Sequence, residues 1–383
     1  MITAHKFRLY PNKETENKLL ETLELCRQTY NILLAELNNQ KEIDKSQIQG
    51  VIPDMKICDP RFNKLHSKTM QYECYRLFSN LRALAKSKKK RKVGRLRFKG
   101  KGWFKTFSYN QSGFKIMQTG KRCQTLWLSK IGNIPIRCHR EIGGKIKQVT
   151  IKREASGRWF ASVIEDDSRE IIKQPVNKIV GIDLGLTDIV YDSEGNSISN
   201  PRHLKNKEKK LKYLQRRMSL KEKGSNHRND WRLKVARQYE RLTNSRNDFL
   251  HKLSRHYVDN YDTIAMENLQ INNMVHSKLA KSILDSGWGR LRQFISYKAG
   301  NAGKLYIPVD YKGTTQRCSQ CGAKIHKELW EREHKCSCGF IAPRDYNSAL
   351  EIKNLCLLKI PQELWESTHQ EMEALPMVTS VRE

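Results

Sequence analysis

Apolar positions along the first 165 residues follow first the period of a strand, then of a helix, then of strands again. Residues 2–10 alternate like a strand, and residues 14–40 carry apolar side chains at helical spacing. A polar loop rich in Lys and Asp leads to a second helix over about 64–86. Short alternating segments with glycine turns recur from 106 to 165. We expect a small β-barrel or sheet here, completed by residues 2–10, with a helical insertion at about 14–90.

The second half contains short runs that are apolar throughout, which is typical of strands buried on both faces. These runs cover residues 179–185 and 263–267, with shorter strands predicted at 189–191 and 304–309. Residues 201–260 predict two long basic helices broken near Gly224, and residues 280–300 predict a further helix. The residues from about 362 lack periodicity, so we expect a mobile tail there.

The net charge points to a polyanionic partner. Lys and Arg number 72 against 40 Asp and Glu, a formal charge of +32. Nucleic acid is the expected partner, because each neutralised phosphate releases a condensed counterion. Anionic lipid would attract the same charge, but cations interleave with aromatic residues between 95 and 109, as on a surface that stacks bases and contacts phosphates.

Length and composition exclude several classes of protein. At about 100–200 residues per domain, 383 residues predict two to four domains. No run approaches the roughly 18 apolar residues of a membrane span, and the first residues lack the apolar run of a signal peptide. We therefore expect a cytoplasmic protein with no membrane partner, not a secreted enzyme or a transporter.

Four of the ten cysteines cluster near the C-terminus. Cys318 and Cys321 form one pair, Cys336 and Cys338 a second, and fourteen residues separate the pairs. Two short knuckles that hold one ion are the usual arrangement of structural Zn²⁺. The second knuckle is one residue shorter than usual, and His326 or His334 could replace one thiolate, which we disfavour. A redox dithiol pair is the weaker alternative, because no thioredoxin-like context surrounds it.

Three carboxylates stand out by their surroundings. Asp183 lies in an apolar strand, Glu267 ends another, and Asp345 begins a helix directly after the cysteine cluster. A carboxylate buried in a strand is costly unless it is paired or binds a metal. Each has an ordinary alternative, namely an Asp beside a turn, an edge Glu and a helix N-cap. Taken together they fit a two-metal centre that cleaves phosphodiesters.

A phosphate-binding loop is the specific rival for Asp183. Residues 181–185, Gly-Ile-Asp-Leu-Gly, resemble the first phosphate loop of actin-like ATPases and sugar kinases. Those proteins continue with Thr or Ser and carry later glycine-rich loops. Here Leu186 follows and no such later loop is found, so the kinase interpretation is disfavoured.

A series of motifs in order resembles the TnpB family, the RNA-guided nucleases of bacterial insertion sequences that are related to type V CRISPR effectors. The matching segments are residues 7–11, 30–31, 95–99, 181–186, 246–252, 267–269, 297–299, 315–322 and 344–349. The resemblance covers about residues 1–357. Two departures are the short second knuckle and Pro343, which stands where the family often has an acidic residue.

The resemblance implies a fold class and its domains. The fold would be α/β, an RNase H-like (RuvC) nuclease domain with an inserted zinc ribbon and an N-terminal β-barrel wedge domain carrying a helical recognition insertion. The implied boundaries are 1–10 and 91–175 for the wedge, 11–90 for recognition, 176–314 and 341–360 for the nuclease, and 315–340 for the ribbon, with 361–383 as the tail.

The resemblance also implies site residues and cofactors. Asp183, Glu267 and Asp345 match the catalytic triad that holds two Mg²⁺, while Cys318, Cys321, Cys336 and Cys338 match the structural Zn²⁺ ligands. Candidate nucleic-acid contacts are Ser67, Lys68 and Gln71 for reading DNA, Arg97 and Lys99 in the basic aromatic segment, and Arg344 at the scissile phosphate. Each of these six also has an ordinary interpretation as a solvated polar residue.

The expected activity is RNA-guided cleavage of double-stranded DNA next to a short transposon-adjacent motif. The implied partners are a guide RNA from the transposon end and the target DNA, in a monomeric ribonucleoprotein. A catalytically inactive guided repressor is one alternative, which the presence of all three acids disfavours. A DDE-type transposase is another, which the order Asp183, Glu267, Asp345 disfavours, because its last acid is typically Glu.

Overall fold

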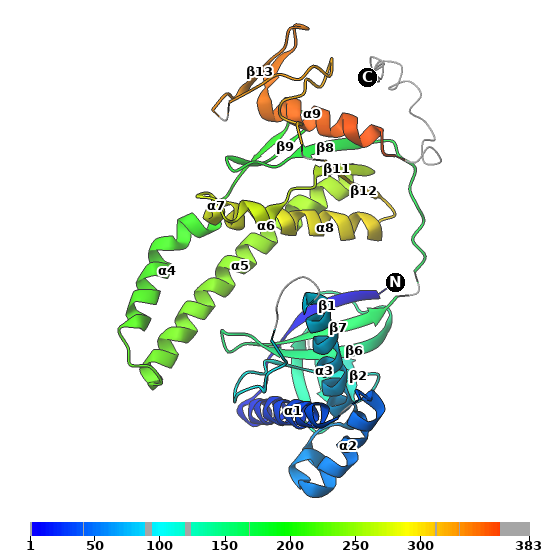
Figure 1. Cartoon of the computed structure of the whole chain (residues 1–383), viewed down its shortest axis with the longest axis vertical. Coiled ribbons are helices and arrows are strands. Elements are labelled where there is room, and N and C mark those ends of the chain that lie inside the picture. The colour runs from blue at the N-terminus through cyan, green and yellow to red at the C-terminus, as the bar shows by residue number, and fades with distance from the viewer. Residues whose placement is uncertain are drawn as a thin grey trace. The chain divides into compact units, whose positions relative to one another are not determined.

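The computed structural model describes residues 2–40, 42–88, 94–118, 124–167, 169–310, 312–328 and 330–360 (Figure 1). The chain divides into two compact units, Met1–Glu170 and Ile171–Glu383, which we call the N-terminal and C-terminal units. The tail expected from about 362 lies outside the described residues.

The N-terminal unit is built on an antiparallel sheet of seven strands in the order β2-β6-β7-β1-β5-β4-β3. Strand β1 pairs with β7 along its whole length and with β5 on its other side, so residues 2–9 complete the sheet as expected. The strands are β1 (Ile2–Leu9), β2 (Thr106–Asn110), β3 (Phe114–Gln118), β4 (Gln124–Leu128), β5 (Gly132–Arg137), β6 (Lys145–Arg153) and β7 (Trp159–Asp166).

In the described residues of the N-terminal unit, the sheet is accompanied by three helices and one 3-10 turn, coloured blue to cyan in Figure 1. They are α1 (Lys13–Asn39), α2 (Lys45–Cys58), η1 (Pro60–Lys64) and α3 (Ser67–Lys88). Alternate residues of β7, including Trp159, Ala161 and Val163, are buried in one apolar core with residues of α1 and α3. This burial is the physical basis of the period-two pattern seen in the sequence.

Helix α2 corrects the polar loop expected between the two helices. The Asp44 side chain accepts a hydrogen bond of 2.7 Å from the Ser46 amide and so caps the helix. Ile48, Ile52 and Met55 are its buried residues, spaced four and three apart. The sequence hides this helix because Gly50 and Pro53 lie inside it, and both residue types disfavour a helix interior.

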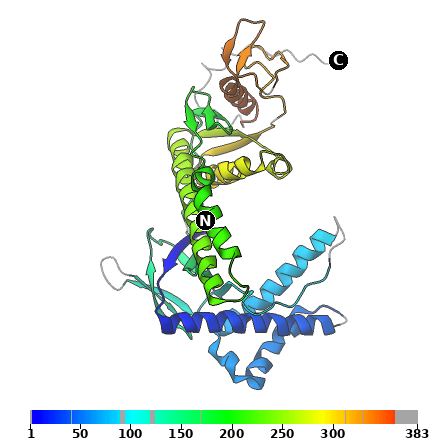
Figure 2. The same ribbon diagram turned by 90° about the vertical axis from the view of Figure 1, so that its left-hand side faces the viewer.

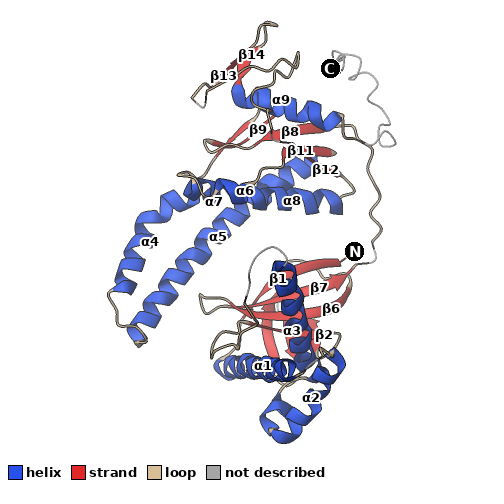
Figure 3. Ribbon diagram, viewed as in Figure 1, coloured by secondary structure: helices blue, strands red, loops and turns tan. Residues whose placement is uncertain are grey.

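The C-terminal unit contains a mixed sheet of five strands in the order β10-β9-β8-β11-β12 (Figure 3). Strand β11 runs parallel to both β8 and β12, whereas β9 is antiparallel to β8 and to β10. Every residue of β8 and β11 is buried, as the continuous apolar runs predicted. The strands are β8 (Ile179–Asp183), β9 (Asp188–Asp192), β10 (Ser197–Ser199), β11 (Thr263–Glu267) and β12 (Leu305–Val309).

The remaining elements of the C-terminal unit are helices and a small hairpin. They are α4 (His203–Ser219), α5 (Asn226–Asn260), α6 (Ile271–Met274), α7 (Ala280–Ser286), α8 (Trp288–Asn301), β13 (Glu333–Lys335), β14 (Ile341–Pro343) and α9 (Arg344–Leu357). The single helix expected over 280–300 is two helices, because Gly287 adopts a φ of 71° between them.

The basic helical hairpin expected over 201–260 is confirmed. Helices α4 and α5 lie side by side in both views and are joined near Gly224 (Figure 2). Leu211, Leu214 and Val235 form a small apolar core between them, separate from the core beneath the sheet. Among the described residues, no helix combines the length and apolar character needed to cross a membrane.

Helix α9 approaches the sheet closely at β8. A Cβ atom on Gly181 would lie 2.2 Å from the main-chain oxygen of Ala349, so a glycine is required at this contact. This packing fixes the helix that begins at Arg344 against the strand that ends at Asp183.

Candidate active site

Two buried carboxylates end two neighbouring parallel strands. Ile182 of β8 pairs with Met266 of β11, so the next residues, Asp183 and Glu267, emerge together at the same edge of the sheet. Each is only 7% exposed. The pKa of Asp183 is raised well above its ordinary value. Burial is the largest cause of this shift, and the nearby negative charges of Glu267 and Asp345 add to it. Two strands therefore bring together acids that are 84 residues apart in the chain.

Asp345 contributes the third carboxylate from the first turn of α9. Pro343 occupies the N-cap position, so the N-cap alternative for Asp345 is wrong. Arg344 is the first residue of this helix and bonds to the cysteine region: its Nε is 3.2 Å from Asp345 Oδ1, and its Nη1 donates to the main-chain oxygen of Glu331 at 3.0 Å. With its side chain 15% exposed, Arg344 is not an ordinary surface charge.

A threonine that the sequence did not single out contacts the site. The Thr314 hydroxyl donates a hydrogen bond to Oε1 of Glu267, and Thr314 is itself 2% exposed. Burial raises the pKa of Glu267, and this bond opposes the shift by stabilising the ionised form. Nothing in the sequence distinguishes Thr314 from its neighbour Thr315, because only the fold reveals which hydroxyl reaches the acid.

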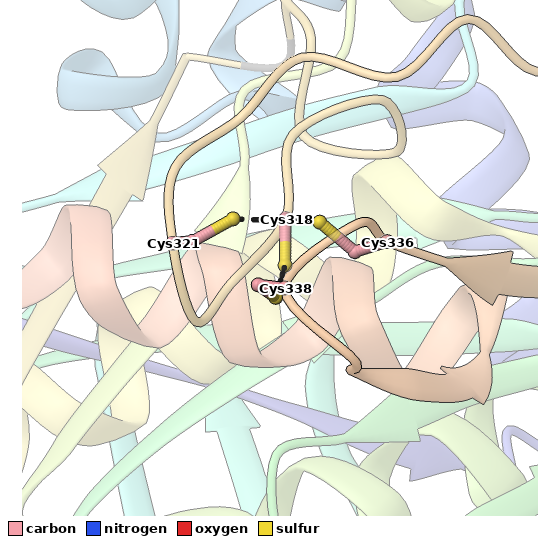
Figure 4. A group of neighbouring side chains, drawn as sticks. All are labelled: Cys318, Cys321, Cys336 and Cys338. Carbon is pink, nitrogen blue, oxygen red and sulfur yellow. Dashed lines mark hydrogen bonds between the residues drawn. The ribbon is translucent and has the colours of Figure 1, made fainter.

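The four clustered cysteines form one compact site. The sulfur atoms of Cys318, Cys321, Cys336 and Cys338 all lie within 4.8 Å of one another (Figure 4). Among the described residues, this is the group of three or more His, Cys, Asp or Glu side chains whose ligand atoms lie close enough together to hold one metal ion. A hydrogen bond from the Cys338 amide is the main cause that lowers the pKa of Cys336, which favours the thiolate needed for metal binding. Four thiols in this arrangement indicate structural zinc binding.

The structure also bears on the histidines considered as substitute ligands. His334 is fully buried, but its Nδ1 contacts Nζ of Lys327, and neither His326 nor His334 belongs to the compact group. The short second knuckle still brings both of its sulfurs into the cluster, helped by the left-handed turn at Gly339, with a φ of 91°.

Two asparagines on α9 attach the first knuckle to the helix that carries Asp345. Asn347 donates to the main-chain oxygen of Arg317 at 2.8 Å and accepts from the Ser319 amide at 3.0 Å. Asn354 donates to the Ser319 oxygen at 2.7 Å. We call these three bonds the asparagine clamp.

The candidates for DNA contact lie in the N-terminal unit. Ser67 and Gln71 line a groove of about 950 Å³ between α2 and α3, together with Lys45 and Lys56. Lys56 donates to the Ser67 hydroxyl at 2.8 Å. Lys68 is partly buried next to Ser67 and is not among the groove residues.

Arg97 and Lys99 lie on a segment held against α1. Asn31 accepts from the Lys99 amide at 2.8 Å and donates to its oxygen at 3.0 Å. The Lys99 Nζ is 5.4 Å from the ring centre of Trp103, which is 67% exposed. Arg97 is exposed. The backbone is therefore anchored while its cations and an aromatic face remain accessible.

Comparison with known proteins gives several consistent matches. The chain is 32% identical over 357 residues to a "Putative RNA-guided DNA endonuclease" of Streptomyces pristinaespiralis, covering 89% of this chain and 86% of the relative. It is 28% identical to the "Putative RNA-guided DNA endonuclease InsQ" of Escherichia coli K12, covering 84% and 83%. A Cas12f1 endodeoxyribonuclease of Sulfoacidibacillus thermotolerans is 28% identical over 50% of this chain and 49% of the relative.

Family profiles match three segments. Residues 163–278 match a family described as "Probable transposase", residues 288–352 a Cas12f1-like TNB domain, and residues 1–44 a helix-turn-helix domain. In this structure residues 1–44 contain strand β1 and the long helix α1, not a pair of short helices.

Solved structures share the fold. A Cas12f1–sgRNA–target DNA complex aligns with a TM-score of 0.56 at 13% identity, over 92% of this chain and 99% of that one. The mini-RNA-guided endonuclease CRISPR-Cas_phi3 aligns with a TM-score of 0.58 at 9% identity, over 94% and 93%. At such low identity these matches establish a common α/β fold.

Proposed function

The chain belongs to the TnpB family, and from that premise we propose that it is an RNA-guided DNA endonuclease encoded by an insertion sequence. The observation that carries the proposal is the convergence of Asp183, Glu267 and Asp345 at one edge of a buried sheet. Two buried carboxylates, Asp183 and Glu267, and the partly exposed carboxylate of Asp345 provide the oxygen ligands that Mg²⁺ prefers.

The three acids would hold two Mg²⁺. Asp183 and Glu267 fit this role because both are buried and Asp183 lies within reach of the charges of both other acids, an arrangement that is unfavourable without a cation. The chemistry supplied there by bound Mg²⁺ is activation of a water and stabilisation of the leaving 3′ oxygen. Arg344, fixed beside Asp345, would contact the scissile phosphate.

The proposed architecture follows the family. The strand order of the C-terminal unit, with the third, second, first, fourth and fifth strands side by side, supports an RNase H-like (RuvC) nuclease domain over 176–314 and 341–360. The zinc ribbon would be residues 315–340. The sheet at 1–10 and 91–175 would be the β-barrel wedge domain, and residues 11–90 the recognition insertion.

Recognition would be divided between RNA pairing and protein contacts. A guide RNA from the transposon end would select the target by base pairing, in a monomeric ribonucleoprotein acting on nucleoid DNA. Ser67, Lys68 and Gln71 would read the adjacent motif of the double-stranded DNA beside the groove between α2 and α3. Arg97 and Lys99 would contact nucleic-acid phosphates, and the exposed Trp103 ring offers a stacking surface.

The test uses the protein co-expressed with its own genomic flanking region and then purified. Any co-purifying RNA is sequenced, and the complex is incubated with Mg²⁺ and a plasmid carrying a guide-matched site beside a randomised flank. We expect double-strand cuts that depend on the guide, select one flanking motif and disappear in Asp183→Ala.

Other outcomes would support the alternatives. Stable guide-dependent binding without cutting would indicate a repressor. Strand transfer of a DNA end, without any need for RNA, would indicate a DDE-type transposase. If no discrete RNA co-purified, the guided mechanism would be wrong.

A further inference from the structure

The loop between β12 and the first cysteine contacts both candidate metal centres. Among the described residues of this loop, Thr314 lies beside Glu267 and Cys318 belongs to the cysteine cluster. Its backbone is fixed at the midpoint, where the amides of Gln316 and Arg317 donate to the oxygen of Gly313 at 3.0 and 2.9 Å. Gly313 has a φ of 84°, which favours glycine and sets the direction of the turn.

We propose that Thr314 is a positioning residue for Glu267, and that the cysteine cluster holds Thr314 in place through the asparagine clamp on α9. The proposal rests on the proposed function, because it takes Glu267 as a ligand of the catalytic Mg²⁺. It adds a physical link between the zinc ribbon and the catalytic acids.

The first step of the argument is the contact itself. Thr314 and Glu267 are both almost completely buried, and the hydroxyl donates to one carboxylate oxygen. A bond to one oxygen fixes the rotation of the carboxylate, so the other oxygen keeps a constant direction. Hydrogen-bond partners of metal ligands orient those ligands in this way in other metal sites.

The second step is the path from Thr314 to the cysteines and α9. The Gly313 turn joins Thr314 rigidly to Arg317, and Asn347 binds the main chain of Arg317 and Ser319 on both sides of Cys318. Asn347 lies two residues after Asp345 on the same helix. One continuous set of bonds therefore connects Glu267, the first knuckle and the helix that carries Asp345.

A second threonine provides a matched control. Thr263 lies on β11 with Glu267 and is fully buried, but its hydroxyl has no hydrogen-bond partner among the residues that the structure describes. Thr314→Val and Thr263→Val therefore make the same chemical change in buried positions of one region. Only the first removes a bond to a candidate metal ligand.

The experiment measures Mn²⁺ binding to the full-length protein by electron paramagnetic resonance, together with the Mg²⁺ dependence of guided cleavage. Asp183→Ala defines the signal that belongs to the catalytic site. We expect Thr314→Val to weaken Mn²⁺ affinity and raise the half-saturating Mg²⁺ concentration by about 10–100-fold. Thr314→Ser should restore both, and Thr263→Val should change neither by more than about twofold.

Zinc content and melting temperature are measured for every variant. Asn347→Ala, which breaks the clamp without touching Thr314, should shift the metal dependence in the same direction as Thr314→Val. If Thr314→Val does not fold, Thr314→Ala and Asn347→Ala carry the test.

Three results would overturn the proposal: unchanged metal affinity in folded Thr314→Val, equal defects in the Val and Ser variants, or an Asn347→Ala protein with normal metal dependence. Failure of the proposed function looks different, since the wild-type protein would then show no Mn²⁺ signal lost in Asp183→Ala and no guided cleavage.

Discussion

The cysteine cluster and the carboxylate cluster are two candidate metal sites built in opposite ways. The four cysteines span residues 318–338 and come from two short knuckles, whereas the three acids come from positions 183, 267 and 345 on two strands and a helix. The sulfur atoms all lie within 4.8 Å of one another, and the carboxylates are not gathered that tightly.

Burial also differs between the two sites. Cys321 and Cys338 are exposed, while Asp183 and Glu267 are each 7% exposed. Thiolates that surround one ion complete its coordination and need no shielding by the rest of the fold. Catalytic carboxylates must leave ligand positions for a substrate, so the surrounding fold has to hold them apart and exclude bulk water. A local motif therefore suffices for a metal site whose coordination is complete. A tertiary framework is needed for a site that must leave ligand positions open.

The largest effect is expected from removing one carboxylate. Asp183→Asn should reduce cleavage on the order of 10³-fold or more, because the proposed Mg²⁺ ligand would be lost while the side-chain shape is kept. Zinc content and melting temperature should stay close to wild type. The measurement is single-turnover cleavage of a guide-matched plasmid at saturating Mg²⁺.

Asp188→Asn is the matched control, since Asp188 lies on the neighbouring strand β9 and accepts a bond from the exposed Ser199 hydroxyl. Its cleavage rate should equal that of wild type. A comparable loss in both variants would show that charge in this sheet, and not the acid cluster, determines activity.

Disrupting the cysteine site should reduce cleavage less than Asp183→Asn does, and should lower the thermal stability more. Cys338→Ser should abolish zinc binding, lower the melting temperature of the C-terminal unit, and reduce cleavage by about 10–100-fold. Metal analysis and thermal unfolding check this, with Cys58→Ser as control, because Cys58 is an exposed free cysteine of the N-terminal unit. Full cleavage activity in a zinc-free Cys338→Ser protein would show that the acid cluster does not depend on the cysteine site.

Arg344 lies between the two sites, so its loss tests whether they are independent. Arg344→Gln should reduce cleavage by about 10-fold, because it removes a charged hydrogen bond to Asp345 and one to the Glu331 main chain. The exposed Arg332 provides the control variant Arg332→Gln, which should cleave normally. Equal rates for the two variants would contradict a role for Arg344 beside the acids.

Replacing Glu73, a buried acid outside the candidate active site, should change the stability of the protein and leave cleavage unchanged. Glu73 on α3 is completely buried, and burial raises its pKa from 4.5 to about 8, with Arg76 at 3.1 Å as a partial counter-charge. Because the folded-state pKa is raised, its contribution to stability is complete below pH 4.5 and is lost as the pH rises toward 8.

Glu73→Gln should therefore stabilise the protein by about 4 kcal/mol at pH 8, and the gain should shrink toward pH 5. Urea unfolding at a series of pH values measures this, and cleavage at pH 7.5 should match wild type. A pH-independent gain would mean that packing, not ionisation, is responsible.

Local patterns made much of this protein predictable. Strand β1, the long helix α1 and the basic hairpin of α4 and α5 follow directly from hydrophobic period, because each buries one face at the spacing that the backbone dictates. Helix α2 does not follow from the pattern because Gly50 and Pro53 stand inside it, and the break at Gly287 does not because a single glycine is compatible with a continuous helix.

The chain's own sequence determined its charge, its cysteine site and the identity of the three acids. Cysteine spacing is local, and an acid within an apolar run is conspicuous because its burial must be compensated. Tertiary structure alone decided which groups surround those acids. Thr314 lies beside Glu267 because β12, which precedes it, pairs in parallel with β11, and the asparagine clamp is brought to the sheet because α9 packs on Gly181. Contacts between segments far apart in the chain depend on sheet register and helix packing, and local residue patterns do not encode them.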